Sequence, residues 1–560
     1  MKTWSIQKTI GDKETIEDII STLLANRGLL KKKDQELFLH PKDPKTCKPI
    51  DVGIDPTLFK KAVKRIEEAI EKKESIVVYT DYDADGITAG AIMWEALHGL
   101  GANIMPYVPH RVEEGYGLSE KGIDAVEKEF HPTLIITVDH GISAASQVAY
   151  AKSLGIDVVV TDHHLKPDVL PDCPIVHTTD LCGAGVSWFV VKELFNNQQR
   201  RTKDEELTDL LSLAAIGTIA DMVPLVGANR SIAKFGLEAL CTTKRVGLLA
   251  ILKDAGASQD QISSYVVSHM ITPRLNALGR LEHALVALRL LCTKNNVRAE
   301  ELATKLGLTN KERQKMTLDS SNHAKNEVIK IHGKIVSKKI LLIAHESYNQ
   351  GIIGLVAGKL VEEYYLPSIV LSKGEELSKA SARSIQGFNI VEAIRSFQEL
   401  LVDVGGHPLA AGFTIETKNI PLLQEKLEAY AEMHITEAML HKPLMIDVEM
   451  PLSSATEKLW ENIRGFEPFG LGNYEPVFVT REVSIVEVRQ IGADGKHLKL
   501  KIQQRTRNQE LRTIDAVAFS MGNLYNSLKP DQQIAIAYTI DMNEWNGRRN
   551  LQLKIRDILL

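Results

Sequence analysis

The chain has 560 residues, of which 44% are hydrophobic and 25% are charged, and its formal net charge is −5. Because a single hydrophobic core stops growing at about 250 to 300 residues, a chain of this length is expected to form several domains. The composition is typical of globular proteins and excludes a disordered, fibrous or membrane-embedded chain. The slightly acidic charge gives no general sign of nucleic-acid binding, so a DNA-binding groove would have to be basic only locally.

The cysteines and the N-terminus indicate the cellular compartment. Cys47, Cys173, Cys182, Cys241 and Cys292 show no CxxC or other ligand spacing, so neither a zinc ribbon nor a disulfide framework is expected. The N-terminal segment lacks the apolar stretch of a signal peptide, and no run of about 20 apolar residues follows it. We therefore expect a cytoplasmic protein that makes no contact with a membrane. A monomer is taken as the default, because the sequence does not show the oligomeric state.

The first half of the chain has the pattern of an α/β lobe. Between residues 75 and 176, the runs SIVVYT, TLIITVD, IDVVVTD and CPIVH predict strands, and GITAGAIMWEALHGLG and AASQVAYAKSLG predict helices. This alternation is typical of right-handed βαβ units around a parallel sheet. Residues 1–235 are therefore predicted to form this lobe together with an N-terminal extension.

The remainder of the chain predicts three further parts. Apolar residues at helical spacing predict a helical connector at residues 236–335. The segments KILLIAHE, GIIGLVAGKLVEEYY and LPSIVLS predict a second, smaller α/β lobe at residues 336–440. In residues 441–560 the runs SIVEVRQI, HLKLKIQQ, TIDAVAFS, QIAIAYTID and LQLKIRDIL predict an all-β barrel of the OB type.

Acidic and imidazole side chains gather at the expected carboxyl ends of three strands in the first lobe. They are Asp81, Asp83, Asp85, Asp139, Asp162, His163 and His164. A single Asp after a strand usually only caps the next helix, but three such ends meet at one edge of a parallel sheet. Carboxylates packed together repel one another unless a cation neutralises them, and oxygen with imidazole ligands suits manganese or magnesium.

A further carboxylate, Asp221, stands alone in the apolar stretch AAIGTIADMVPL, which is predicted to be helical. Because burying an unpaired charge is costly, this position favours a metal-ligand role. The alternative is a residue at the end of a helix that pairs with a neighbouring Arg or Lys.

The segments DYDADG, VDHG, DHH and GTIAD, in this order, resemble the four signature motifs of the DHH phosphoesterases. Other segments resemble the RecJ exonucleases, a family within that superfamily. They are YVPHRVEEGYGLS, LCGAGVSW, ITPRLNALGRL, GLTNKERQ, SARSIQGFNI and GGHPLAAGF, and the resemblance spans nearly the whole chain. His140, Ser347-Tyr348-Asn349 and Ala380 depart from the RecJ pattern of Asn, a Trp-His pair and Gly.

The resemblance implies a single-stranded-DNA-specific exonuclease of DNA repair and recombination that works from 5′ to 3′ and releases 5′-mononucleotides. It implies two divalent ions, Mn²⁺ or Mg²⁺. The implied metal ligands are Asp83, Asp85, Asp139, His163 and Asp221. The implied catalytic residues are Asp139, which would bridge the ions, His164, which would face the scissile phosphate, and Asp162, which would orient the histidines.

The resemblance also implies how the substrate is held. Guanidinium groups match phosphate oxygens, so the 5′ phosphate would meet a pocket of Arg111, Tyr116, Arg280, Ser381 and Arg383. The backbone would approach DNA closely at Gly405, Gly406 and His407. Basic and aromatic barrel residues would add phosphate and base contacts: Arg481, Arg489, Lys496, Lys499, Lys501, Trp545, Arg548 and Arg549. The partners implied are single-stranded DNA, a single-strand-binding protein and a helicase.

Other members of the superfamily remain as alternatives. A DHH phosphodiesterase of short oligonucleotides or cyclic dinucleotides would share the metal motifs, but such enzymes usually lack the barrel and the PRLNALGR element. A non-catalytic RecJ-like scaffold would have lost its metal ligands, and all of them are present here. A manganese pyrophosphatase would need neither the connector nor the barrel.

Overall fold

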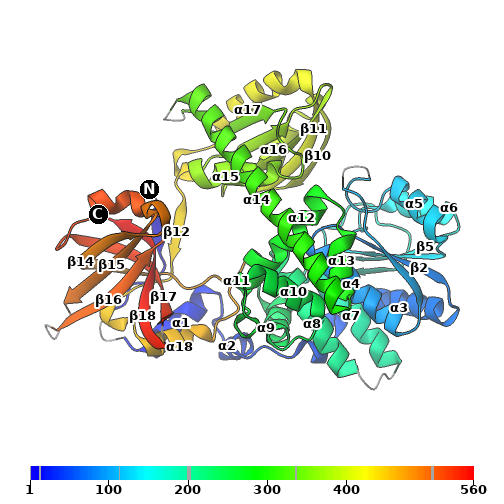
Figure 1. The fold of residues 1–560 in the computed structure, drawn as a ribbon, viewed down its shortest axis with the longest axis horizontal. Helices are drawn as coiled ribbons and strands as arrows, with labels where there is room; N and C mark the ends of the chain where they lie inside the picture. Colours follow the sequence, from blue (N-terminus) through cyan, green and yellow to red (C-terminus); the bar gives the residue numbers. More distant parts are fainter. Residues whose placement is uncertain are drawn as a thin grey trace. The chain divides into compact units, whose positions relative to one another are not determined.

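The computed structural model describes residues 2–11, 14–111, 114–198, 203–333, 337–505, 510–545 and 547–560 (Figure 1). The chain divides into two compact units. One unit comprises Met1–Thr3 and Pro273–Lys442, and the other comprises Trp4–Thr272 and Pro443–Leu560. In the described ranges, no helix is long and apolar enough to cross a membrane.

The larger unit contains a five-stranded parallel sheet in the order β3-β2-β4-β5-β6. Its strands are β2 (Ser75–Thr80), β3 (Asn103–Tyr107), β4 (Leu134–Val138), β5 (Asp157–Asp162) and β6 (Ile175–His177). The central strands are apolar along nearly their whole length because helices cover both faces of the sheet, which confirms the parallel α/β prediction. Strand β3 was not predicted, because it is a partly exposed edge strand that contains Pro106.

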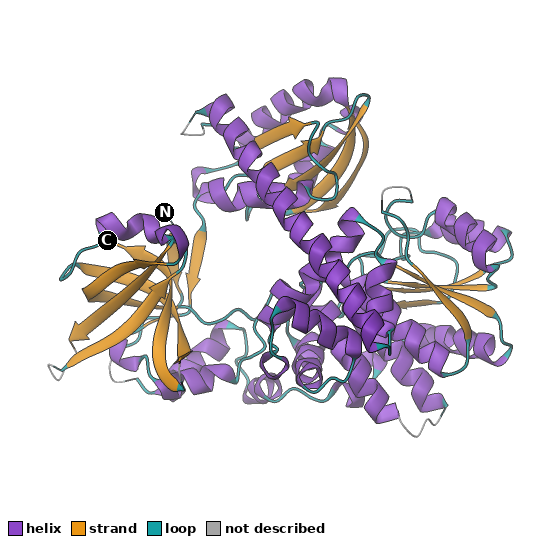
Figure 2. Ribbon diagram, in the orientation of Figure 1, coloured by secondary structure: helices purple, strands orange, loops and turns teal. Residues whose placement is uncertain are grey.

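Helices lie on both faces of this sheet, as Figure 2 shows. They are α3 (Pro56–Glu71), α4 (Ala84–Gly99), α5 (Glu120–Phe130), α6 (Ala145–Ser153) and α7 (Gly183–Asn197). Helices α5 and α6 cover one face, where Ile123, Val126 and Val148 join the core under Val77 and Ile135. On the other face, α4 is buried along most of its length and packs against β2 and α7.

Helix α8 (Lys203–Ala220) packs beside α4 and α7, and a buried arginine ties α8 and α4 together. The Arg245 guanidinium donates to both carboxylate oxygens of Glu95 on α4, at 2.9 and 2.7 Å. It also lies 2.7 Å from the Asp209 carboxylate on α8. This ion triad fixes the position of α8 along α4, which matters because the start of α4 and the end of α8 both contribute to the candidate site.

Further helices follow along the chain, in agreement with the predicted connector. They are α9 (Gly227–Cys241), α10 (Val246–Ala255), α11 (Ser264–Val266), α12 (Thr272–Leu281), α13 (Leu285–Cys292) and α14 (Asn296–His332), with a π-helical turn at Val267–Ile271. The boundary between the two units falls at the start of α12, between Thr272 and Pro273.

The smaller unit contains a five-stranded mixed sheet in the order β10-β11-β9-β8-β7. Its strands are β7 (Leu341–His345), β8 (Ser368–Ser372), β9 (Leu377–Arg383), β10 (Leu401–His407) and β11 (Ala410–Glu416). Only β7 and β8 are parallel, and the VGGHPLAAGF segment is the antiparallel hairpin β10–β11. Helices α15 (Ile353–Tyr364), α16 (Ile390–Arg395) and α17 (Ile420–His434) complete this second α/β lobe.

The C-terminal strands close into a barrel, as predicted. They are β14 (Phe478–Ile491), β15 (His497–Arg505), β16 (Leu511–Ala518), β17 (Gln533–Trp545) and β18 (Arg548–Leu559), with short strands β13 (Val448–Glu449), β1 (Thr3–Ile6) and β12 (Pro443–Ile446) beside them. Strand β14 pairs with both β15 and β17, which closes the ring. The barrel core also takes apolar side chains from α1 (Ile16–Asn26), α2 (Lys32–Leu39) and α18 (Glu457–Arg464).

A buried arginine connects this barrel assembly to helix α9. Arg230 on α9 is only 1% exposed, and its guanidinium lies 4.0 Å from the ring of Phe38 on α2. It donates to four backbone carbonyl oxygens, those of Phe38, Gly465, Phe466 and Glu467. Burial lowers the pKa of Arg230 to about 10, so the group stays charged at neutral pH.

Replacing Arg230 with Met should destabilise the larger unit by about 3 kcal/mol, because buried carbonyl oxygens lose their donors while the apolar volume is kept. The measurement is the midpoint of thermal unfolding by calorimetry. Arg298→Met removes an exposed arginine paired with Glu301 and serves as the control. Equal midpoints for the two variants would show that Arg230 does not hold the barrel assembly in place.

Candidate metal centre

The acidic residues expected at the sheet edge do meet there. Asp81 directly follows β2, Asp139 directly follows β4, and Asp162 is the last residue of β5. Since these three strands are parallel neighbours, their carboxyl ends lie side by side. All three side chains are buried, with exposures of 3% or less.

Two further carboxylates come from the start of α4. Asp83 caps this helix, and its carboxylate accepts hydrogen bonds from the backbone N–H groups of Asp85 and Gly86, at 2.9 and 3.0 Å. The Asp85 carboxylate accepts from the N–H groups of Gly183 and Ala184 at the start of α7, at 2.6 and 2.9 Å. Helix N-termini favour negative charge, so these contacts hold both carboxylates in place at the site.

Asp139 has a left-handed backbone conformation, with φ of +68°, which Asp and Asn tolerate better than most residues. Its N–H donates to the Thr161 carbonyl at 3.0 Å. A Cβ atom at Gly183 would lie 2.5 Å from the Asp139 side chain, so glycine is required there. Asp139 Oδ1 then lies 3.1 Å from His163 Nε2.

Asp221 completes the group from a different direction. It follows Ala220, the last residue of α8, so it lies just beyond a helix rather than inside one as its apolar surroundings had indicated. Its Oδ2 lies 3.6 Å from His163 Nε2, and Asp85 Oδ2 lies 4.0 Å from the same nitrogen. His163 Nε2 is therefore the point on which Asp85, Asp139 and Asp221 converge.

Three overlapping sets of side chains have ligand atoms within 4.8 Å of one another. They are Asp139, His163 and His164; Asp85, His163 and Asp221; and Asp81, Asp83 and Asp139. Asp139 Oδ1 and His163 Nε2 are both buried and have no hydrogen bond within the described part of the chain. Buried polar atoms without partners are rare unless they serve a ligand, so these side chains fit a divalent metal ion.

The pKa values of these groups have a common cause. Burial and the nearby charge of Asp83 raise the pKa of Asp81 well above its usual value, and burial and Asp85 do the same for Asp139. Burial and Asp85 raise the pKa of Asp221 to about 8. Burial lowers the pKa of His163, which keeps its imidazole neutral and able to bind a metal. A divalent cation would relieve the repulsion among the carboxylates.

His164 differs from His163 in its partners. Strand β5 ends at Asp162, so His163 and His164 are not bound by the rule that successive strand residues point to opposite faces. Their rings lie 4.5 Å apart. Asp162 accepts a hydrogen bond from His164 Nδ1 at 2.8 Å and another from the Ile142 N–H. Burial alone would lower the pKa of His164, but the hydrogen bond and charge of Asp162 raise it to about 9. His164 is therefore a cation at neutral pH.

Tyr116 lies beside this histidine, and Tyr82, which the sequence had not indicated, contacts both Tyr116 and Arg111. The Tyr116 hydroxyl lies 3.1 Å from His164 Nε2. The ring of Tyr82 lies edge-on to Tyr116, at 6.2 Å, and the Arg111 guanidinium lies 4.9 Å from the Tyr82 ring. Tyr82 gave no signal of its own because it stands between Asp81 and Asp83 in the motif.

His140, which departs from the RecJ pattern, is 1% exposed, and its Nε2 lies 3.0 Å from the Tyr79 carbonyl at the end of β2. Burial lowers the pKa of His140 to about 4, so it is neutral. His140 therefore packs between the ends of β2 and β4.

The other residues expected to bind substrate belong to the smaller unit. Arg280 donates to the Gly351 carbonyl at 3.1 Å. Arg383 donates to Ser381 Oγ at 3.3 Å, and a Cβ atom at Gly354 would come within 2.9 Å of that oxygen. These three residues thus lie around the turn at residues 351–354, where α15 begins. Gly405, Gly406 and His407 are exposed on β10.

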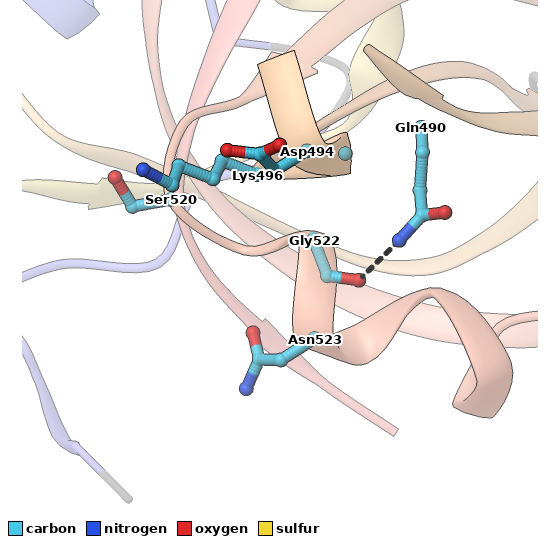
Figure 3. A pocket seen from close by; sticks show the side chains of 7 residues that line it. Gln490, Asp494, Lys496, Ser520, Gly522 and Asn523 are labelled. Carbon is cyan, nitrogen blue, oxygen red and sulfur yellow. Dashed lines mark hydrogen bonds between the residues drawn. The ribbon is translucent and has the colours of Figure 1, made fainter. Parts of the chain in front are cut away.

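The barrel carries a polar cavity of about 490 Å³ between its β14–β15 and β16–β17 connections (Figure 3). It is lined by Gln490, Asp494, Gly495, Lys496, Ser520, Gly522 and Asn523. Of the basic residues expected to contact DNA, Lys496 lines this cavity, whereas Arg481 and Arg549 form ion pairs with Glu449 and Glu544. The Trp545 side chain lies outside the described part of the structure.

The fold and the site together define the class of protein. An Asp/His cluster at the carboxyl edge of a parallel sheet and a second α/β lobe characterise a DHH-type protein, and the OB barrel narrows the class further. Residues 75–218 match the family described as "DHH family, N-terminal domain", residues 332–433 match the "DHHA1 domain", and residues 446–557 match the "RecJ OB domain".

Comparison with known proteins identifies the family. The chain is 37% identical to the single-stranded-DNA-specific exonuclease RecJ of Bacillus subtilis, over 99% of this chain and 70% of that protein. It is 26% identical to RecJ of Thermus thermophilus in complex with Mn²⁺, with a TM-score of 0.81 over 99% of this chain and 79% of that one. A second structure, with Mg²⁺, gives a TM-score of 0.77 at 26% identity over 100% and 78% of the two chains. The chain belongs to the RecJ family.

Mn²⁺ should stabilise the protein by about 2.7 kcal/mol when its concentration exceeds the dissociation constant a hundredfold. Asp139→Asn should remove this gain and leave the metal-free protein at least as stable as the unchanged chain, because one of several repelling carboxylates is gone and Asn accepts the left-handed backbone. Thermal unfolding with Mn²⁺ and with chelator measures both effects. Asp168→Asn, which changes an exposed carboxylate of the neighbouring loop, is the control. An equal Mn²⁺ response in the Asp139 variant would rule out this centre.

Proposed function

We propose that this protein is a metal-dependent exonuclease specific for single-stranded DNA, which degrades its substrate from the 5′ end and releases 5′-mononucleotides. Membership of the RecJ family supports this activity. The observation that carries it is the convergence of Asp85, Asp139 and Asp221 on the buried Nε2 of His163. Such a cluster serves phosphodiester hydrolysis, for which divalent ions supply Lewis acidity and positive charge.

The proposed metal ligands, for two ions of Mn²⁺ or Mg²⁺, are Asp83, Asp85, Asp139, His163 and Asp221. Asp139 belongs to two of the three sets of converging ligand atoms, which supports a bridging position. The hydrogen bonds from α4 and α7 leave Asp83 and Asp85 little freedom to turn. Preorganised ligands bind a metal ion without the cost of ordering the side chains.

His164 and Asp162 are the proposed catalytic partners of the metal site. Asp162 holds the imidazole of His164 through Nδ1, so that Nε2 faces Tyr116 and the cluster. Because His164 is a cation, its Nε2–H can donate a hydrogen bond to a phosphate oxygen, where negative charge develops during hydrolysis. Tyr116 and Arg111 are proposed substrate contacts beside it.

Recognition of the 5′ phosphate is proposed for Arg280, Ser381 and Arg383, with the exposed Gly405, Gly406 and His407 close to the strand. Burial lowers the pKa of Arg383, and among the described residues this guanidinium has no carboxylate partner. A partly buried cation without a counter-charge is suited to an anionic ligand, and a guanidinium can bind two phosphate oxygens at once.

The wider setting follows from the same family. We propose four domains, at residues 1–235, 236–335, 336–440 and 441–560, and a monomer that acts in DNA repair and recombination in the cytoplasm. A single-strand-binding protein and a helicase are the proposed partners. Of the alternatives, the short-oligonucleotide phosphodiesterase is disfavoured by the match to the RecJ OB domain, and the non-catalytic scaffold by the converging ligands.

The polarity can be tested with single strands labelled at either the 5′ or the 3′ end, incubated with Mn²⁺. Labelled mononucleotide should appear at once from the 5′-labelled strand and only late from the 3′-labelled one. Blunt duplex should be degraded at least tenfold more slowly, and chelator or Asp139→Asn should abolish release. Immediate release from the 3′ end, or equal rates on duplex, would contradict the proposal. Activity confined to dinucleotides or trinucleotides would favour the phosphodiesterase.

The phosphate pocket can be tested with Arg383→Gln. Loss of a charged hydrogen bond of about 2 kcal/mol should reduce kcat/KM on 5′-phosphorylated strands about 30-fold, with little change on 5′-hydroxyl strands. Arg395→Gln, on the exposed side of α16, is the control and should leave both values unchanged. An equal loss on both strands would mean that Arg383 does not read the 5′ phosphate.

A further inference from the structure

A short segment that leads into the barrel touches the chain next to a metal ligand. Residues 466–473, with the sequence FEPFGLGN, lie between α18 and β14, and we name this segment the strap. Arg230 holds its beginning by donating to the Phe466 and Glu467 carbonyl oxygens, at 2.7 and 2.9 Å. At its end, the 1% exposed Asn473 donates to the Phe466 and Pro468 carbonyl oxygens and accepts from Arg27 Nε. Both ends of the strap are therefore fixed.

The middle of the strap lies against Pro224 and Leu225. The Leu225 N–H donates to the Leu471 carbonyl at 2.7 Å. A Cβ atom at Gly470 would lie 2.6 Å from Leu225 Cδ1, and one at Gly472 would lie 3.0 Å from Pro224 Cβ. Leu225 is 2% exposed and has little room to move. Both strap glycines therefore allow the close approach of the strap to residues 224–225.

Within the described residues, the Asp221 carboxylate lacks the backbone hydrogen bonds that hold those of Asp83 and Asp85. The carboxylates of Asp83 and Asp85 accept backbone hydrogen bonds, whereas that of Asp221 accepts none from any residue that the structure describes. Its own N–H donates to Gly217 in α8. Met222, which follows it, has φ of +59° and is 67% exposed, so the chain turns outward immediately after the ligand. The position of Asp221 is thus set by α8 on one side and by residues 224–225 on the other.

We propose that the strap is a positioning element of the metal centre: it holds Pro224 and Leu225, and through them it places the Asp221 carboxylate opposite His163. This inference rests on the proposed function, because it takes Asp221 as a metal ligand. The barrel thereby contributes to metal binding without supplying a ligand, through the segment that precedes its first long strand. A change in the strap should move Asp221 and leave Asp85, Asp139 and His163 in place.

Gly470→Ala tests the proposal in the full chain, because the added methyl group meets Leu225. The concentration of Mn²⁺ needed for half-saturation, measured from the electron paramagnetic resonance signal of free Mn²⁺, should rise about tenfold, as for other supports of a metal ligand. The KM for single-stranded DNA should stay unchanged. Gly358→Ala adds a methyl group where no atom lies within 4 Å, and this control should bind Mn²⁺ like the unchanged protein.

Two double variants distinguish positioning from general damage. In Gly470→Ala/Leu225→Ala the clashing side chain is removed, and Mn²⁺ affinity should recover toward that of the unchanged protein. Gly470→Ala/Asp221→Asn should have the same Mn²⁺ affinity as Asp221→Asn alone, because the two changes act on one ligand. If Gly470→Ala does not fold, the test compares the Mn²⁺ affinity of Leu225→Ala with that of the double variant Gly470→Ala/Leu225→Ala.

The outcomes separate this inference from the proposed function. Mn²⁺ affinity of Gly470→Ala equal to that of the unchanged protein, or a loss that adds fully to that of Asp221→Asn, would overturn the positioning role of the strap. If instead the unchanged protein binds no Mn²⁺, or Asp221→Asn binds it equally well, the proposed metal centre itself fails.

Discussion

Mutual repulsion among buried carboxylates is the constraint on which the rest of the structure depends. Asp81, Asp139 and Asp221 all have raised pKa values because they are buried beside other acidic groups. Such an arrangement is unfavourable without a cation, and contacts elsewhere in the fold hold the carboxylates together. The parallel sheet brings the strand ends together, and helix N-termini hold the carboxylates that lie between them. The centre is thus preorganised for a divalent ion at the expense of the metal-free protein.

Support for this centre comes from distant parts of the chain. Glycines at positions 183 and 217 leave room for Asp139 and Asp85, since a Cβ atom at either would overlap the carboxylate. The ion triad around Arg245 fixes α8 against α4, far along both helices from the cluster. Arg230 holds the strap, which contacts the segment that follows Asp221, and we propose that the two extend this support to the barrel assembly. Glycine and arginine therefore shape the metal centre although neither binds the ion.

The sequence predicted the regular parts of the fold from local patterns. The β-branched runs of the first lobe and the period-two runs of the barrel became the expected strands, since burial of one or both faces leaves a clear signal. Strand β3 was not predicted, because a partly exposed edge strand with Pro106 lacks the pattern of buried apolar residues. Asp221 was recognised as unusual, but its place just after α8 follows from where the helix stops. Tyr82 was missed because an aromatic residue among aspartates has no periodicity of its own.

By itself the sequence determined the βαβ order, the barrel strands, the type of metal chemistry and the family resemblance, because each depends on residues near one another along the chain. Only the tertiary structure decided that His163 Nε2 is the point of convergence and that the strap lies against Leu225. These are contacts between segments separated by up to hundreds of residues. Their geometry depends on helix ends, strand register and the space left by glycine, which local patterns do not encode.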